Sequence, residues 1–163
     1  MIQQCSGYDF GVEHQAVRIG FEGRQVSAEL HGVRAEETVK IRDFCMDWFS
    51  SRTGPTVAGI TEQTFTLFLP VSSSVAKTEE QMEEMIRELE RYLPTVRFQA
   101  GMGTPQIGLE KWKISLKEAK LALRAMRIFQ WEGVRTIWKT QPAALLLDIR
   151  DHRQLYLLRN PVI

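Results

Sequence analysis

Alternation of apolar and polar residues predicts a strand as the first element. Val17, Ile19 and Phe21 alternate with Arg18 and Gly20, which is the period of a strand with one covered face. Downstream, apolar residues recur every three or four positions and predict a helix over about residues 34–51. Its apolar stripe consists of Ile41, Phe44, Cys45, Trp48 and Phe49.

Two short β-rich runs follow, over residues 56–60 and 64–70, and the linking residues Thr61-Glu62-Gln63 suggest a hairpin. The next helix has a capping-box signal, Thr78-Glu79-Glu80-Gln81, with Thr78 as the predicted cap. Pro94 ends this helix. Its apolar face is formed by Met82, Met85, Ile86, Leu89 and Leu93.

The last third of the chain predicts a strand at Val96, Phe98 and Ala100, a glycine-containing loop at 101–105 and a helix over 109–129. A final strand is predicted over residues 134–138. The fold class is therefore α+β, a two-layer β-α-β-β-α-β core with an added C-terminal αβ unit, and a mixed, mostly antiparallel sheet covered by helices. The inward face of the long helix consists of Trp112, Leu116, Ala119, Leu123 and Met126.

Composition favours one globular domain, since 163 residues with 44% hydrophobic content can bury a real core. The net charge of +1 gives no global attraction to nucleic acid or to an acidic membrane. Neither a secretory leader nor a membrane-length apolar stretch is expected, so a cytoplasmic location is predicted. With two cysteines, Cys5 and Cys45, reduced thiols are expected.

The long helix carries a basic stripe, because five cations recur at three- and four-residue steps and fall on one arc of its surface. One interpretation is a solvated face whose long stems cover apolar surface. The other is a docking strip for an acidic partner, a neighbouring domain or nucleic acid phosphate. The basic stripe consists of Lys113, Lys117, Lys120, Arg124 and Arg127.

Other candidate chemistry is weaker. The loop at Gly101-Met102-Gly103 lies where phosphate loops occur but lacks their spacing, which favours a plain strand-to-helix turn. Neither cysteine lies at ligand spacing to a histidine, so no zinc site is expected at His14, His31 or His152. Trp48 and Trp112 are interpreted as core or interface residues.

The segment VRFQAGMGTPQIGLEKWKISLKEAKLALRAM, residues 96–126, resembles the late strand, Gly-x-Gly loop and S-x-x-E-A-x-x-A-L helix of GGDEF-like domains in PucR/CdaR-type bacterial regulators. Gly7-Tyr8-Asp9 resembles the entry of that domain, and residues 134–147 resemble its exit. The resemblance covers nearly the whole chain. The matching helix letters are Ser115, Glu118, Ala119, Ala122 and Leu123.

The same fold includes diguanylate cyclases, whose Gly-Gly-Asp-Glu-Phe signature corresponds here to Thr61-Glu62-Gln63-Thr64-Phe65. Only the phenylalanine is kept. Cyclases place further aspartates on the first strand, where this chain has none, and Mg²⁺ requires such oxygen ligands. The resemblance thus implies no catalytic residues, no metal site and no cofactor. Arg52 keeps the arginine of an inhibitory Arg-x-x-Asp box without its aspartate, which makes it a weak ligand-binding candidate beside a plain helix-end cation.

The favoured function is a non-catalytic signalling and dimerisation module of a bacterial transcriptional regulator. Residues 1–142 would form the GGDEF-like domain, and residues 143–163 would lead toward a helix-turn-helix domain outside this chain. Expected partners are a second copy and other domains of the same regulator, without sequence-specific DNA binding by this chain and without a membrane. The alternative is a small-molecule or nucleotide sensor derived from a diguanylate cyclase, without turnover.

Overall fold

The computed structural model describes residues 11–23, 35–52, 57–61, 63–71 and 74–140. The predicted β-α-β-β-α-β core and the added αβ unit are confirmed, and a short strand, β5, lies in the expected loop region. In chain order the elements are β1 (Glu13–Gly23), α2 (Ala35–Arg52), β2 (Val57–Thr61), β3 (Thr64–Pro70), α3 (Val75–Tyr92), β4 (Val96–Met102), β5 (Gln106–Ile107), α4 (Leu109–Phe129) and β6 (Gly133–Thr136).

The strands form one sheet in the order β2-β3-β1-β4-β6, and β5 pairs with one end of β1. Every pairing is antiparallel except that of β4 with β6, which is parallel. The prediction of a mixed, mostly antiparallel sheet is therefore confirmed. Successive residues of β1 are buried along most of its length, so side chains on both of its faces meet other elements.

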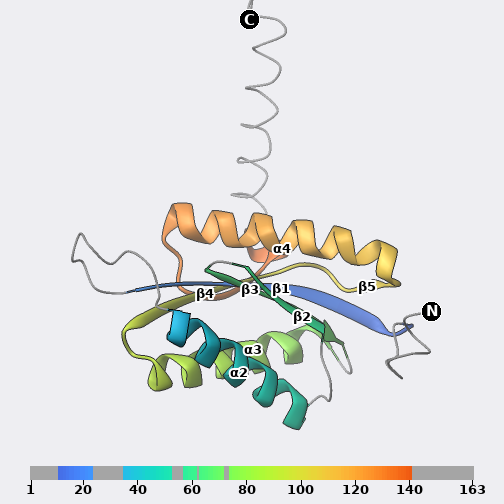
Figure 1. Ribbon diagram of the computed structural model, residues 1–163. Helices are drawn as coiled ribbons and strands as arrows, with labels where there is room; N and C mark the ends of the chain where they lie inside the picture. The colour runs from blue at the N-terminus through green and yellow to red at the C-terminus, as the bar shows by residue number, and fades with distance from the viewer. Residues whose placement is uncertain (1–10, 24–34, 53–56, 62, 72–73, 141–163) are drawn as a thin grey trace, which may run out of the picture.

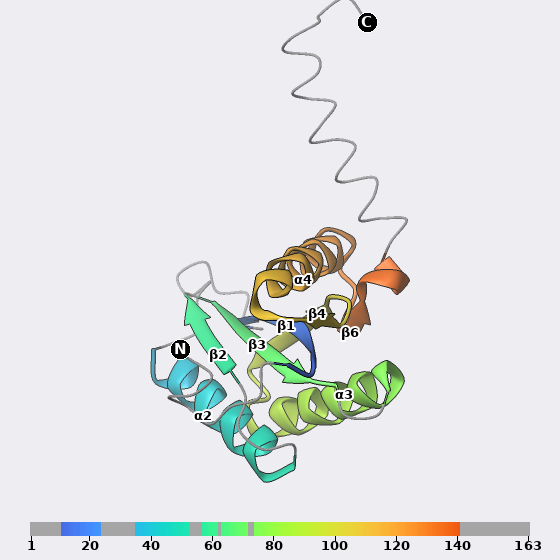
Figure 2. The same ribbon diagram turned by 90° about the vertical axis from the view of Figure 1, so that its right-hand side faces the viewer.

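Helices lie on both faces of the sheet: α2 and α3 cover one face and α4 covers the other (Figures 1 and 2). The molecule thus has three layers and not the expected two, and the expectation that β1 has one covered face is wrong. The residues of β1 that face α4 include Ala16 and Gly20, which are small enough to let α4 and its side chains approach closely. No helix among the described residues has the length and apolarity that a membrane span requires.

The main core lies between the sheet and the pair α2 and α3. The predicted apolar faces of all three helices are confirmed, although Phe44 and Leu116 are only partly buried. Trp48 and Trp112 are each 5% exposed, as expected for core residues. The largest fully buried side chains include Phe21, Phe49, Phe65, Phe98, Ile19, Ile41, Leu67 and Leu89.

Two predicted element boundaries are wrong. The cap of α3 is Ser74, whose hydroxyl accepts a hydrogen bond from the Lys77 N–H at 3.2 Å, whereas Thr78 lies inside the helix and donates to the Ser74 carbonyl. The last strand ends at Thr136, and residues 137–140 are helical. This turn is stabilised because Ile137 packs against α4 and the Thr140 hydroxyl donates to the Ile137 carbonyl at 3.1 Å.

Candidate functional site

The hairpin turn lies against the C-terminal part of β1. Gly20 pairs with Thr64 across β1 and β3, and the Phe21 N–H donates to the Gln63 carbonyl at 3.2 Å. Thr61 pairs with Thr64 at the end of the hairpin. Glu62 lies outside the described residues. The structure therefore brings together the two segments that carry the catalytic groups in cyclases.

Among the residues that the structure describes, the side chains at this place supply little negative charge. Gln63 and Thr64 are partly buried, and Phe65 is 1% exposed within the core. The nearest acid on β1, Glu22, is directed to Arg97 of β4, with 3.9 Å between Glu22 Oε1 and Arg97 Nη1. Within the described ranges, no group of three His, Cys, Asp or Glu side chains is close enough to hold a metal ion.

Two arginines meet on the face of β1 that α4 covers. A Cβ at Gly20 would lie 2.6 Å from Nη2 of Arg127, so the Arg127 guanidinium rests directly on the Gly20 backbone. Arg18, two residues earlier on the same face, donates from Nη1 to the Thr66 hydroxyl at 3.0 Å. Arg127 comes from the last turn of α4. Sequence reasoning found Arg127 in the basic stripe but missed Arg18, whose signal was a cation within an apolar strand.

The electrostatics of this arginine pair, Arg18 and Arg127, favour an anion. Burial, and secondly the positive charge of Arg127, lower the pKa of Arg18 from its usual value. Neither guanidinium has a carboxylate within ion-pair distance in the part of the chain that the structure describes. Guanidinium groups bind carboxylate and phosphate groups well, because their N–H groups are arranged as a fork.

The other members of the basic stripe lie on the outer face of α4, and all five cations are exposed. The stripe is thus a surface feature, and Arg127 also reaches the sheet at Gly20. Within residues 113–127 the single acid is Glu118, which accepts hydrogen bonds from the Thr104 N–H and hydroxyl. The outer face of α4 therefore carries positive charge along most of its length.

The described contacts of the Arg52 side chain are with residues of its own helix, α2. Its guanidinium lies 3.9 Å from the centre of the Trp48 ring, and Nη1 donates to the Trp48 carbonyl and the Ser51 hydroxyl, each at 3.3 Å. These contacts are those of a cation at a helix C-terminus. The residues that follow, 53–56, lie outside the described ranges, so the inhibitory-box comparison is not tested.

The residues of α4 that resemble the family helix contact the sheet directly. The Ser115 hydroxyl accepts from the Ala16 N–H at 2.8 Å, and a Cβ at Gly101 would lie 2.6 Å from the Ala119 carbonyl oxygen. Gly103 likewise lies against the Ser115 backbone. The glycines are therefore packing positions that permit close approach of α4, and a phosphate would find their face occupied.

The histidine and cysteine candidates are core residues where the structure describes them. The Nδ1 atom of His14 lies 2.8 Å from the Val12 carbonyl oxygen, and its ring packs 4.5 Å from Trp112. Cys45 is fully buried in the main core. His31, His152 and Cys5 lie outside the described residues.

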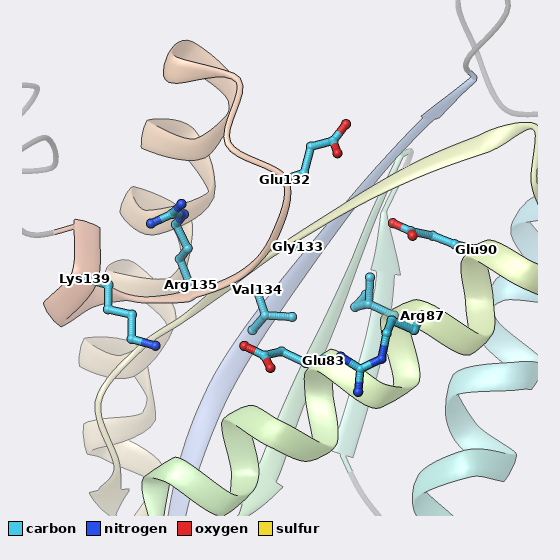
Figure 3. Close-up of a pocket in the computed structure, with 9 residues that line it drawn as sticks. Glu83, Arg87, Glu90, Glu132, Gly133, Val134, Arg135 and Lys139 are labelled. Carbon is cyan, nitrogen blue, oxygen red and sulfur yellow. The ribbon is translucent and has the colours of Figure 1, made fainter.

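A separate hollow of about 480 Å³ lies between α3 and β6 (Figure 3). Its charged lining contains three acids and three bases, so it favours neither a phosphate group nor a metal ion. One acid, Glu132, lies 3.3 Å from Arg97, and one base, Lys139, pairs with Glu79 outside the lining. The hollow is lined by Glu83, Ile86, Arg87, Glu90, Glu132, Gly133, Val134, Arg135 and Lys139.

Comparison with known families matches residues 6–125 to the GGDEF-like domain. The match covers most of the chain and includes the hairpin, Arg18 of the arginine pair, and the α4 residues that resemble the family helix, whereas Arg127 lies just beyond it. The chain therefore belongs to the GGDEF-like domain family. No curated protein matches it.

Proposed function

We propose that the chain is a non-catalytic signalling module of a bacterial transcriptional regulator of the PucR/CdaR kind. The observation that carries this proposal is the guanidinium of Arg127 on Gly20, beside the hairpin turn. Phosphoryl transfer in cyclases needs Mg²⁺ held by carboxylates. The positive charge of Arg127 at Gly20, the residue that pairs with Thr64, opposes the binding of such a cation, which supports the loss of the cyclase chemistry.

The test is incubation of the purified chain with GTP and Mg²⁺, with an active diguanylate cyclase run in parallel. We expect no cyclic dinucleotide by chromatography. Substituting Thr61→Gly, Glu62→Gly, Gln63→Asp and Thr64→Glu together should not restore activity, because β1 still lacks its acids and Arg127 still covers Gly20. Mg²⁺-dependent product from the unmodified chain would refute the proposal.

In this proposal, residues 1–142 form the module and residues 143–163 lead toward a DNA-binding helix-turn-helix domain. The module acts in the cytoplasm and relays an effector signal through contacts in a homodimer and with the other domains. Light scattering on the purified chain tests the dimer. A mass that stays at one copy, 18.8 kDa, across the accessible concentration range would contradict self-association by this chain.

A second candidate function is a sensor that binds an anionic small molecule or nucleotide without turnover. The arginine pair favours it, because two neighbouring guanidinium groups without a carboxylate partner among the described residues gain by binding an anion. Thermal unfolding with pyrophosphate or GTP, in the presence of EDTA, tests this function. A ligand at a hundred times its Kd stabilises the folded state by about 2.7 kcal/mol.

The matched variants are Arg18→Gln and Arg127→Gln, with Lys113→Gln as a control on the outer face of α4. We expect the anion-dependent rise in melting temperature to disappear in the first two and to persist in the third. Equal rises in all three variants would indicate nonspecific stabilisation by ions and would exclude this sensor site.

A further inference from the structure

An apolar row runs along one side of α4 next to the basic stripe. Ile114, Leu121 and Ile128 are spaced seven residues apart, which is nearly two full helical turns and places them in one line. Ile114 is 50% exposed and Ile128 is 52% exposed. We name these three residues the apolar seam. Leu121, between them, is of intermediate exposure. Exposed aliphatic side chains that lie along one side of a helix are candidates for a protein contact surface.

The seam has a different neighbour on each side. On the side toward β6, Leu121 is partly buried because it packs with Ala122 and Ile137. Trp138, the residue after Ile137, is 47% exposed. On the other side lie Lys117 and Arg124, each three residues after a seam position and each exposed. The seam therefore has a basic border on one side, whereas its other side carries apolar residues and Glu118, which is hydrogen-bonded to Thr104.

The shape of this surface fits a helix. From Ile114 to Ile128 the rise of an α-helix covers about 21 Å. Figure 1 shows α4 on the outside of the sheet, with none of the other described helices covering its outer side. Apolar residues at seven-residue spacing supply one of the two apolar positions per heptad that pack against a second amphipathic helix.

The charge of the border residues distinguishes a second copy of α4 from an acidic helix as the partner of the seam. Two copies of α4 packed antiparallel through the seam would bring the like-charged borders of both copies together, because equivalent flanking positions face each other in that arrangement. Opposite charges along a contact instead favour encounter and fix the register. We propose that the seam and its basic border form the docking site for an amphipathic helix. This partner helix carries aliphatic residues on the face that contacts the seam, and Asp or Glu residues beside that face.

This proposal rests on the proposed function, since it names the partner chemistry of an interaction module. The probe is a fluorescein-labelled synthetic helix of about 21 residues with leucines at seven-residue-repeat positions and glutamates on both borders. A second peptide has lysines in place of the glutamates. We expect saturable binding of the glutamate peptide to the full chain by fluorescence anisotropy in 50 mM NaCl, and binding of the lysine peptide at least tenfold weaker.

Paired variants test the two halves of the surface. Ile114→Asp with Ile128→Asp should weaken binding of the glutamate peptide at least tenfold, whereas Val39→Asp should leave it unchanged. Val39 is a matched control because it is 44% exposed on α2, which covers the opposite face of the sheet. Lys117→Glu with Arg124→Glu should reduce the preference for the glutamate peptide to less than twofold, because only Lys113, Lys120 and Arg127 then remain in the basic stripe. Circular dichroism melting confirms that each variant is folded.

Several results overturn the proposal: no saturable binding of the glutamate peptide up to 1 mM, equal binding of both peptides, or binding that the isoleucine variants leave intact. A dimer that Ile114→Asp with Ile128→Asp dissociates would assign the seam to a second copy and would also overturn it. Cyclic dinucleotide production is measured separately, so failure of the non-catalytic proposal is distinguished from failure of the docking site.

Discussion

Gly101 shows how a single residue sets the distance between α4 and the sheet. A Cβ at this position would lie 2.5 Å from the Leu123 amide nitrogen and 2.6 Å from the Ala119 carbonyl oxygen. Both atoms belong to helix backbone, so they cannot turn away as a side-chain end would. The glycine is therefore required by close packing and not by an unusual backbone angle.

We predict that Gly101→Ala lowers the free energy of unfolding by about 1–3 kcal/mol, the usual cost of overpacking. The control is Gly59→Ala on β2, where a Cβ would meet nothing within 4 Å. Urea denaturation measures both variants. Equal stability of Gly101→Ala and the unmodified chain would show that α4 can shift without cost.

The buried thiol of Cys45 makes the free energy of unfolding depend on pH. Desolvation by burial raises the pKa of this thiol well above its usual value. The folded state therefore keeps the proton while the unfolded state loses it above about pH 8.5. The stabilisation is complete below that pH and declines as pH rises, by up to about 1.4 kcal/mol per unit.

The prediction is that the free energy of unfolding decreases more steeply between pH 8.5 and 10 in the unmodified chain than in Cys45→Ala. The comparison uses the difference in slope, since the cavity left by the substitution shifts stability at every pH. Parallel slopes in the two proteins would contradict the role of this buried thiol.

At the scale of elements, periodicity predicted the order of helices and strands because each apolar face repeats within one element. Periodicity within a strand does not show which element covers its second face. The packing of α4 against Ala16 and Gly20 of β1 was therefore missed. The start of α3 was missed for a different reason. Ser74 and Thr78 both fit a local capping pattern, and the start of α3 at Val75 selects Ser74.

The cap of α3 gives a prediction at this scale. Ser74→Ala removes the acceptor for the Lys77 N–H and should cost about 1 kcal/mol of stability. Ser74→Gly should cost only a few tenths of that amount, because glycine is tolerated at this position. Chemical denaturation of the two variants checks the order. A larger loss for glycine than for alanine would contradict capping by the side chain.

At the scale of the whole molecule, the resemblance located the hairpin turn and the helix that packs on the sheet, and the family match confirms that region. The arginine pair could not be predicted from sequence. Arg18 lies near the start of the matched region and Arg127 lies just beyond its end, and only the packing of α4 across β1 brings them together. The same packing explains why the basic stripe divides into an outer surface and one inward arginine.

The arrangement of the whole molecule limits the kind of contact that α4 could make with DNA. Reading a base sequence requires an element that enters a groove with side chains reaching the base edges. Here α4 is held against β1 and β4 by Ser115 and Gly101, and the basic stripe offers lysine and arginine without the amide side chains that read adenine. The basic stripe could therefore contact DNA only through its phosphate groups.

We therefore predict weak binding to DNA with the same affinity for duplexes of unrelated sequence. The logarithm of the association constant should fall with the logarithm of salt concentration by about 0.9 per phosphate contact, and Lys117→Glu with Arg124→Glu should flatten that slope. The net charge of +1 gives no further attraction beyond the stripe. Fluorescence anisotropy with two labelled duplexes at several salt concentrations measures both quantities. A tenfold preference for one duplex, or binding that salt does not weaken, would show that the chain reads DNA by a surface other than the basic stripe.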